Sequence, residues 1–195
     1  MNKYIFLSIL CLPQIIKTSD DLPATWQQTG QTLAHYYANA GQVDQLQQRV
    51  QVTDEAMRQT NEQDRYPGST PAHIVLCNRH LSHDQQSSLL KLMLEKHPEL
   101  VHAKKSDGVT LGHLAASRKN IPALCLLRNC GDKFDKKDDR RRSVLDHVAN
   151  FKDSKDRFRA FCIVYPPLAS NFFAAAYALE HGKVIEPAFR SRNAG

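Results

Sequence analysis

Apolar side chains recur along the middle of the chain at the spacing that is typical of amphipathic helices. Two stretches are clearest, and their apolar positions are Leu89, Leu90, Leu92, Met93 and Leu94, followed by Ile121, Leu124, Cys125, Leu126 and Leu127. Pro122 falls in the first turn of the second stretch, where a missing amide is tolerated. Gly131 follows that stretch, at the usual place for a left-handed stop. The pattern predicts short helices separated by turns, and therefore an all-α fold.

A short sequence word recurs along the chain and precedes helical stretches. Its copies are Gly30-Gln-Thr32-Leu-Ala-His35, Gly68-Ser-Thr70-Pro-Ala-His73, Gly108-Val-Thr110-Leu-Gly-His113 and Arg141-Arg-Ser143-Val-Leu-Asp146. Successive Thr or Ser positions are 38, 40 and 33 residues apart. Thr and Ser cap the free amide groups of a helix start, and Pro71 in the first turn loses no hydrogen bond. The repetition predicts one helical unit used several times.

This word and its spacing resemble the ankyrin repeat, whose core word is G-x-T-P-L-H-x-A. The resemblance covers about residues 26–150. It implies an all-α solenoid of helix-turn-helix units joined by hairpin loops, with helical caps at both ends. In such units His35, His73 and His113 would hydrogen-bond the backbone around the Thr and tie adjacent units together.

Some positions depart from the family word. Leu33 stands where Pro is typical, and the fourth copy has Arg141 and Asp146 in place of Gly and His, which marks a degenerate terminal repeat. A polar stretch within residues 50–66 predicts an extended loop in place of the short hairpin. The predicted divisions are an N-terminal apolar segment (1–25), repeats at 26–65, 66–105, 106–138 and from 139–150 onward, a C-terminal helical cap or diverged fifth repeat (151–186) and a flexible tail (187–195).

The N-terminal segment has two interpretations. Lys3 followed by the apolar run from Tyr4 to Leu12 is similar to a secretory signal, but no A-x-A cleavage site lies nearby. Leu10 before Cys11 is also larger than a lipoprotein-type signal allows. The alternative is an amphipathic segment that packs on the first repeat as an end cap.

Composition and charge narrow the classes of protein. With 195 residues, 42% hydrophobic and 24% charged, the chain is neither collagen, a disulfide knot nor wholly disordered, and no run approaches the ~20 apolar residues of a membrane helix. Residues 1–100 contain 8 Lys or Arg and 10 Asp or Glu, whereas residues 101–195 contain 18 and 10. The basic half favours an anionic partner. Five cysteines without a CxxC predict free thiols, buried as small hydrophobes in a reducing compartment.

The sequence gives little support for catalysis or for a metal. It contains no phosphate loop, nucleophile elbow, zinc-protease or dinucleotide motif, and its carboxylates are scattered. Cys77, His80 and His83 have a spacing that could contact zinc, but no second ligand pair accompanies them. We expect no cofactor and no metal. The alternatives are an enzyme with a site in the 50–66 loop or the 150–182 region, and nucleic-acid binding by the basic half, which lacks interleaved aromatics.

The resemblance implies a non-catalytic module that binds a partner protein through its hairpin tips and the exposed side of its first helices. The residues that it places on this face are Tyr66, Pro67, Ser69, Asn78, Arg79, Ser106, Asp107, Val109, Ser117, Arg118, Arg140, Arg142, Asn150 and Phe151. Tyr66 and the arginines are the expected anchors, and the run from Arg140 to Arg142 suits an acidic segment on the partner. We expect a monomer, either cytoplasmic or delivered into a host cell, because small degenerate arrays are frequent among bacterial effectors.

Overall fold

The computed structural model describes residues 30–54, 60 and 67–166. Its helices are α2 (Leu33–Ala40), α3 (Val43–Val52), α4 (Pro71–Cys77), α5 (His83–Lys96), the 3₁₀ helix η3 (Pro98–His102), α6 (Leu111–Ser117), α7 (Ile121–Asn129), α8 (Val144–Ala149) and α9 (Ser154–Val164). Within these ranges the β-structure is limited to two isolated bridges, Lys104–Thr110 and Lys137–Ser143. The predicted all-α class is confirmed for this part of the chain. The predicted N-terminal segment, the tail and the part of the C-terminal cap after residue 166 lie outside the described residues.

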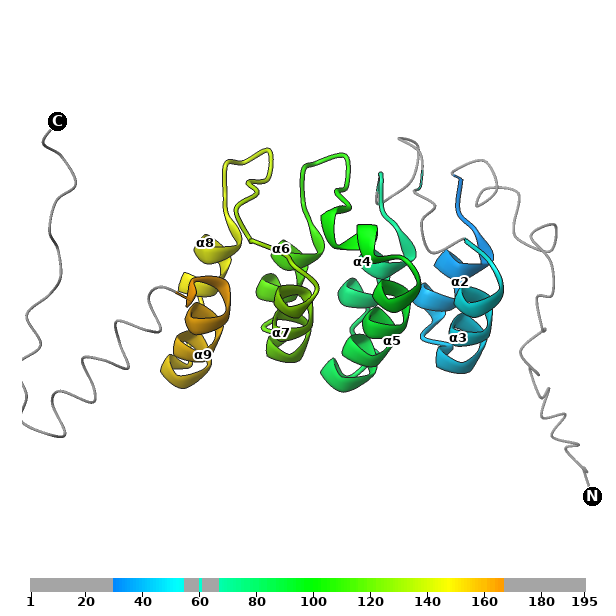
Figure 1. The fold of residues 1–195 in the computed structure, drawn as a ribbon, viewed down its shortest axis with the longest axis horizontal. Helices are drawn as coiled ribbons and strands as arrows, with labels where there is room; N and C mark the ends of the chain where they lie inside the picture. Colours follow the sequence, from blue (N-terminus) through cyan, green and yellow to red (C-terminus); the bar gives the residue numbers. More distant parts are fainter. Residues whose placement is uncertain (1–29, 55–59, 61–66, 167–195) are drawn as a thin grey trace, which may run out of the picture.

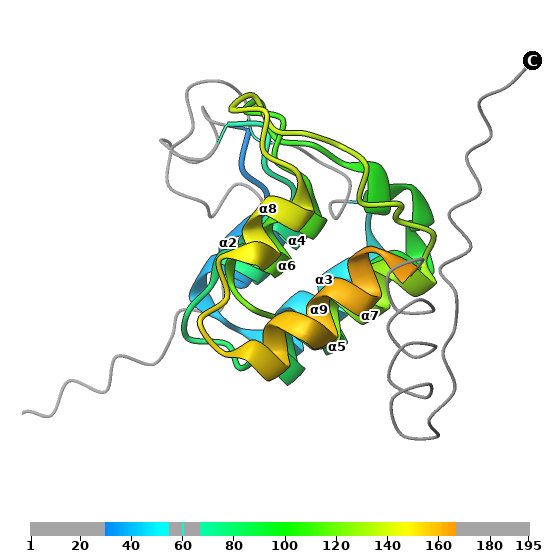
Figure 2. The ribbon, with the colours of Figure 1, turned by 90° about the vertical axis from the view of Figure 1, so that its left-hand side faces the viewer.

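The helices form pairs, and the pairs are stacked in the order of the chain (Figure 1). Within the pairs, α2 packs on α3, α4 on α5, α6 on α7 and α8 on α9. The first helices α2, α4, α6 and α8 make one row, and the second helices α3, α5, α7 and α9 make the other (Figure 2). The loops that join α5 to α6 and α7 to α8 project to the same side of the stack (Figure 1). One side of the molecule is therefore built from repeated loops.

Each first helix begins at the Thr or Ser of the repeated word. The N-caps are Thr32, Thr70, Thr110 and Ser143. In the third unit, the amide of Thr110 donates to Nδ1 of His113 at 3.2 Å, and the amide of His113 donates to Oγ1 of Thr110 at 3.5 Å. The fourth unit keeps this reciprocal capping box with a carboxylate, since the amide of Ser143 donates to Oδ2 of Asp146 at 2.7 Å. The predicted caps are confirmed, and Asp146 preserves the helix start although it replaces His.

Two histidines also connect one unit to the next. Nε2 of His35 lies 3.0 Å from the carbonyl oxygen of Ser69, and Nε2 of His113 lies 3.0 Å from that of Arg142. Because Nδ1 of each ring accepts the amide of its N-cap residue, Nε2 carries the proton and donates to these carbonyls. His73 differs from both. Its Nδ1 accepts the Thr70 amide at 3.1 Å, but its Nε2 is buried without a hydrogen-bond partner in the described part of the chain.

Neighbouring loops are held together by their main chains. The amide of Ser106 donates to the carbonyl of Pro67 at 3.2 Å, and the amide of Asp139 donates to the carbonyl of Asp107 at 3.1 Å. Gly68 occupies the turn with a φ of +68°, and a Cβ there would lie 2.6 Å from the Ser106 nitrogen. The contact of one loop with the next therefore requires both the left-handed backbone and the missing side chain of this glycine.

The apolar core lies along the interface between the two rows of helices. Its fully buried members include Leu33, Leu46, Val75, Leu76, Leu89, Leu90, Met93, Leu111, Leu124, Leu127, Val144 and Val148. The two apolar stretches predicted from the sequence form α5 and α7, and most of their positions are buried. The helices are short, so their stability comes from this shared burial more than from helix propensity.

The thiols are less buried than the sequence predicts. Cys125 and Cys130 are exposed, and Cys77 and Cys162 are half-buried. Cys125 precedes the half-buried Leu126 on α7, on the side of the helix that faces away from the core. The prediction of buried, core-like thiols is therefore wrong for Cys125 and Cys130. Cys125 lies in an apolar run that covers more of the helix circumference than packing buries, and Cys130 is the C-cap residue beyond the end of α7.

A chain of buried amide side chains crosses the turns between the paired helices. The side-chain amide of Asn78 donates to the carbonyl of Ala38 at 2.9 Å, and that of Gln86 donates to the carbonyl of Asn78 at 2.7 Å. The side-chain amide of Asn120 then donates to Oε1 of Gln86 at 2.8 Å, while its Oδ1 accepts the amide of Ala123 at 2.9 Å and caps α7. Asn120 is fully buried. These bonds connect the first three helix pairs through their buried turns.

Candidate protein-interaction surface

The predicted face residues fall into several groups in the structure. Those with exposed side chains are Arg79, Ser106, Asp107, Ser117, Arg140, Arg142 and Asn150. Pro67, Val109 and Arg118 are half-buried. Tyr66, the predicted aromatic anchor, lies outside the described residues. The exposed group comes from the loops between units and from the C-terminal ends of α4, α6 and α8.

Three predicted face residues are buried, and the structure removes them from the exposed surface. Ser69 receives the His35 bridge on its carbonyl, and its amide donates to Oγ1 of Thr60 at 3.1 Å. Asn78 belongs to the buried amide chain. Phe151 is 1% exposed and fills the core beside α8 and α9. Each of these side chains or backbones is occupied by packing between units, which the position in the repeat alone does not reveal.

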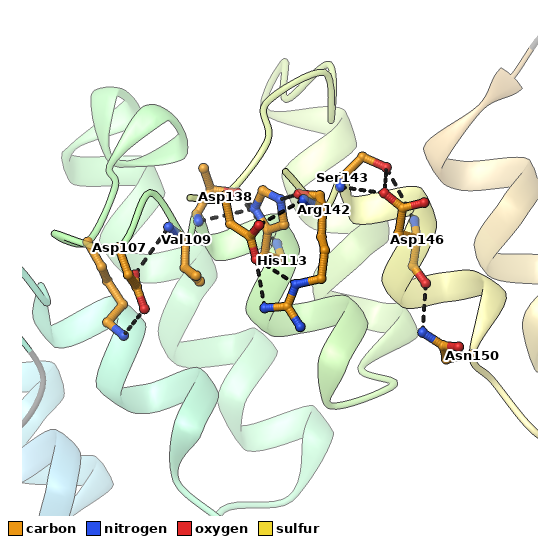
Figure 3. Close-up of polar contacts among 10 residues, drawn as sticks. Asp107, Val109, His113, Asp138, Arg142, Ser143, Asp146 and Asn150 are labelled. Atoms are coloured by element: carbon orange, nitrogen blue, oxygen red, sulfur yellow. Dashed lines mark hydrogen bonds and ion pairs between the residues drawn. The ribbon is translucent and has the colours of Figure 1, made fainter. Parts of the chain in front are cut away.

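Arg142 is exposed but is held by an acidic residue of its own loop (Figure 3). Its Nη2 and Nε lie 2.7 and 2.9 Å from Oδ2 of Asp138, and its amide donates to Oδ1 of the same carboxylate at 2.8 Å. Burial would raise the pKa of Asp138, but the hydrogen bonds and the charge of Arg142 outweigh that effect and hold the pKa below its usual value. The pair shapes the loop and neutralises much of the Arg142 charge.

Asp107 and Asn150 are likewise engaged by their surroundings (Figure 3). Oδ1 of Asp107 accepts the amide of Val109 at 3.3 Å, and Oδ2 lies 3.3 Å from Nζ of Lys105. The side-chain amide of Asn150 donates to the carbonyl of Asp146 at 2.9 Å, at the end of α8. These residues stabilise their turns. In contrast, Arg79 and Arg140 make no hydrogen bond or ion pair with another residue of the described ranges, so their charges are available to a ligand.

The predicted face did not include a hollow on this surface or most of the residues that line it. A cavity of about 540 Å³ lies beside α4, and Lys105 and His80 line it together with the predicted residues Arg79 and Arg118. Lys105 stands three positions before Gly108, at the same offset as Asp138 before Arg141. The recurrence of a charged residue three positions before the first residue of the repeated word could have pointed to Lys105 from the sequence alone.

The described residues contain no group of three or more His, Cys, Asp or Glu side chains that could hold a metal ion. The histidines of the zinc-like spacing, His80 and His83, are exposed, and Cys77 is half-buried. Among the helices of the described ranges, none combines the length and the apolar character needed to span a bilayer. Of the two regions suggested for an enzymatic site, the structure describes residues 50–54 and 60 of the first and 150–166 of the second. No protein-family model matches the sequence, and a search of curated proteins finds no match.

Proposed function

We propose that this chain is an ankyrin-type repeat protein that binds a partner protein with its loops and the exposed side of its first helices. The repeated word at each helix start, the stacking of the pairs in chain order and the common side of the loops support this proposal. The observation that carries it is the contact between loops. Backbone hydrogen bonds join Pro67 to Ser106 and Asp107 to Asp139, so separate loops make one continuous, polar surface.

The charge of this surface favours an acidic segment on the partner. The loop from α7 to α8 exposes six basic side chains: Lys133, Lys136, Lys137, Arg140, Arg141 and Arg142. Two exposed acids, Asp135 and Asp139, offset part of this charge, and Asp138 is already paired with Arg142. Arg79 adds a further cation from the end of α4. Exposed arginines of this kind attract an acidic partner and fix its orientation.

In this proposal the protein is a monomeric, non-catalytic adaptor. It acts in the cytoplasm or, as a bacterial effector, in a host cell after delivery, since small, degenerate arrays of this kind are frequent among such effectors. Catalysis and nucleic-acid binding remain the alternatives, and neither gains a specific observation from the described residues.

The proposal is tested by comparing two doubly charge-reversed variants as baits for affinity capture, followed by binding measurements with the purified partner. Arg79→Glu with Arg140→Glu reverses the charge of two exposed cations of the face that have no acidic partner in the described ranges. Lys155→Glu with Arg159→Glu makes the same charge change on exposed positions of α9. We expect the face variant to lose the partner and the α9 variant to retain it. Retention by both variants, or equal loss from both, would contradict the proposed face.

A further inference from the structure

The cavity beside α4 brings together groups from three segments that are distant in the sequence. His73 and Cys77 come from α4 itself, Arg79 from the turn that follows, Lys105 from the next loop and Arg118 from the end of α6. Its volume of about 540 Å³ lies within the range of ligand-binding pockets, ~300–1,000 Å³. It lies on the face proposed to bind a partner, because the loops and the first helices form its walls.

The lining of this cavity carries positive charge and no acidic side chain. Nη2 of Arg118 donates to the carbonyl of Cys77 at 3.1 Å, and the guanidinium also interacts with the Cys77 thiol, which fixes it at the wall. An arginine has five N–H donors, so these contacts do not use all of them. Lys105 is shared with Asp107, which lies 3.3 Å from its Nζ but does not line the cavity. Arg79 has no acidic partner among the described residues. The cavity therefore presents two arginines and a half-neutralised lysine to whatever enters it.

A buried hydrogen-bond donor accompanies these cations. The Thr70 amide donates to Nδ1 of His73, so the neutral ring carries its proton on Nε2, which is buried against the backbone of Ala103. Burial, with a contribution from the charge of Lys105, lowers the pKa of His73 to about 3, although Asp107 and the backbone of Ala103 oppose the shift. The equivalent Nε2 atoms of His35 and His113 donate to the next unit at 3.0 Å. The Nε2 of His73, which also lines the cavity, makes only a weaker contact with the backbone of Ala103.

We propose that the cavity binds a carboxylate side chain, glutamate or aspartate, from an acidic segment of the partner protein. The inference rests on the proposed function and assigns the chemistry of one pocket within its face. Arg118 and Arg79 supply the charge-assisted hydrogen bonds, and Lys105 adds a further cation. A carboxylate satisfies these groups because it offers several acceptor positions and no donor.

The test is an NMR titration of the full ¹⁵N-labelled chain with small capped amino acids. The probes are N-acetyl-glutamate N-methylamide, its neutral glutamine analogue and the corresponding phosphoserine derivative. We expect the glutamate probe to shift the amide signals of residues 77–80, 105 and 118 and the Nε2–H signal of His73, with a millimolar dissociation constant. The glutamine analogue should bind about tenfold more weakly, since it loses the charge-assisted bonds.

Variants separate the cavity from the rest of the surface. Arg79→Gln with Arg118→Gln should weaken the glutamate probe about tenfold, and Arg79→Gln alone, on an exposed side chain, should weaken it by a smaller factor without loss of fold. Lys155→Gln with Arg159→Gln on α9 should leave binding unchanged. The proposal would be overturned if the glutamate and glutamine probes bound equally, if the signals that shift lay outside the cavity, or if no signal shifted. Tighter binding of the phosphoserine probe would overturn the carboxylate assignment. A partner captured by Arg79→Gln with Arg118→Gln as strongly as by the wild type would refute the pocket and leave the proposed function standing.

Discussion

Substitution of Gly68 by alanine is the sharpest test of how the loops pack. Gly68 has a φ of +68°, and an alanine in this left-handed conformation destabilises the folded state by ~1–2 kcal/mol. Alanine also lowers the conformational entropy of the unfolded chain, which offsets ~0.4–1 kcal/mol of this cost. Its Cβ would also lie 2.6 Å from the Ser106 nitrogen and 2.8 Å from Oγ of Ser106, so the loops would have to separate. Overpacking of this kind costs ~1–3 kcal/mol. The expected total is a loss of about 1–4.5 kcal/mol in the free energy of unfolding.

Gly131→Ala is the matched control, because Gly131 also has a positive φ, +95°, but a Cβ there would meet nothing within 4 Å. It should cost only the conformational part, about 1 kcal/mol. Both free energies are measured by urea unfolding followed by circular dichroism at 222 nm, with the slope m compared to show that the folded state is unchanged. Equal destabilisation by the two substitutions, within about 0.5 kcal/mol, would refute the loop contact and with it the stacking of loops in register.

Three further predictions follow from single contacts, and each is checked by urea unfolding. Arg141 has a left-handed backbone, with a φ of +59°, at the position where the other copies of the repeated word have Gly. Arg141→Gly should therefore raise the free energy of unfolding by about 0.5–1 kcal/mol. A decrease would contradict the assigned turn. Asn120→Ala removes the cap of α7 and leaves Oε1 of Gln86 without its donor, so we expect a loss of about 2–4 kcal/mol, and a loss under 0.5 kcal/mol would mean that the buried amide chain is not formed. The pKa of His73 is lowered to about 3, so below pH 6.5 the unfolded chain binds a proton that the folded chain does not. The contribution of His73 to stability is therefore complete above pH 6.5. The free energy of unfolding should fall by up to about 1.4 kcal/mol per pH unit from pH 6.5 toward pH 3. His73→Asn should make this fall shallower, and an unchanged pH slope would contradict the neutral, buried imidazole.

The features that the sequence predicted correctly are local ones. Thr110 caps a helix because its partner, the amide of His113, is three residues away, and the spacing is visible in the chain. The stripe from Leu89 to Leu94 likewise predicts a helix with a buried side, since the period of the pattern is the period of the helix.

The features that it missed depend on partners far along the chain. Asn78 is buried because its side-chain amide reaches the carbonyl of Ala38, which lies 40 residues earlier. Ser69 is buried because His35 reaches it from the preceding unit, 34 residues away. The cavity beside α4 has the same origin, since Lys105 and Arg118 reach it from other units. Repeat position predicts which residues share a side of the stack, but not which of them the next unit covers.

Hydrogen–deuterium exchange of the chain with and without its captured partner tests the proposed binding face most directly. We expect the partner to protect amides in residues 103–110 and 133–143 and at the C-terminal ends of α4 and α6, while α9 exchanges as it does in the free protein. Protection confined to the second helices α5, α7 and α9, with the loops unchanged, would contradict the account.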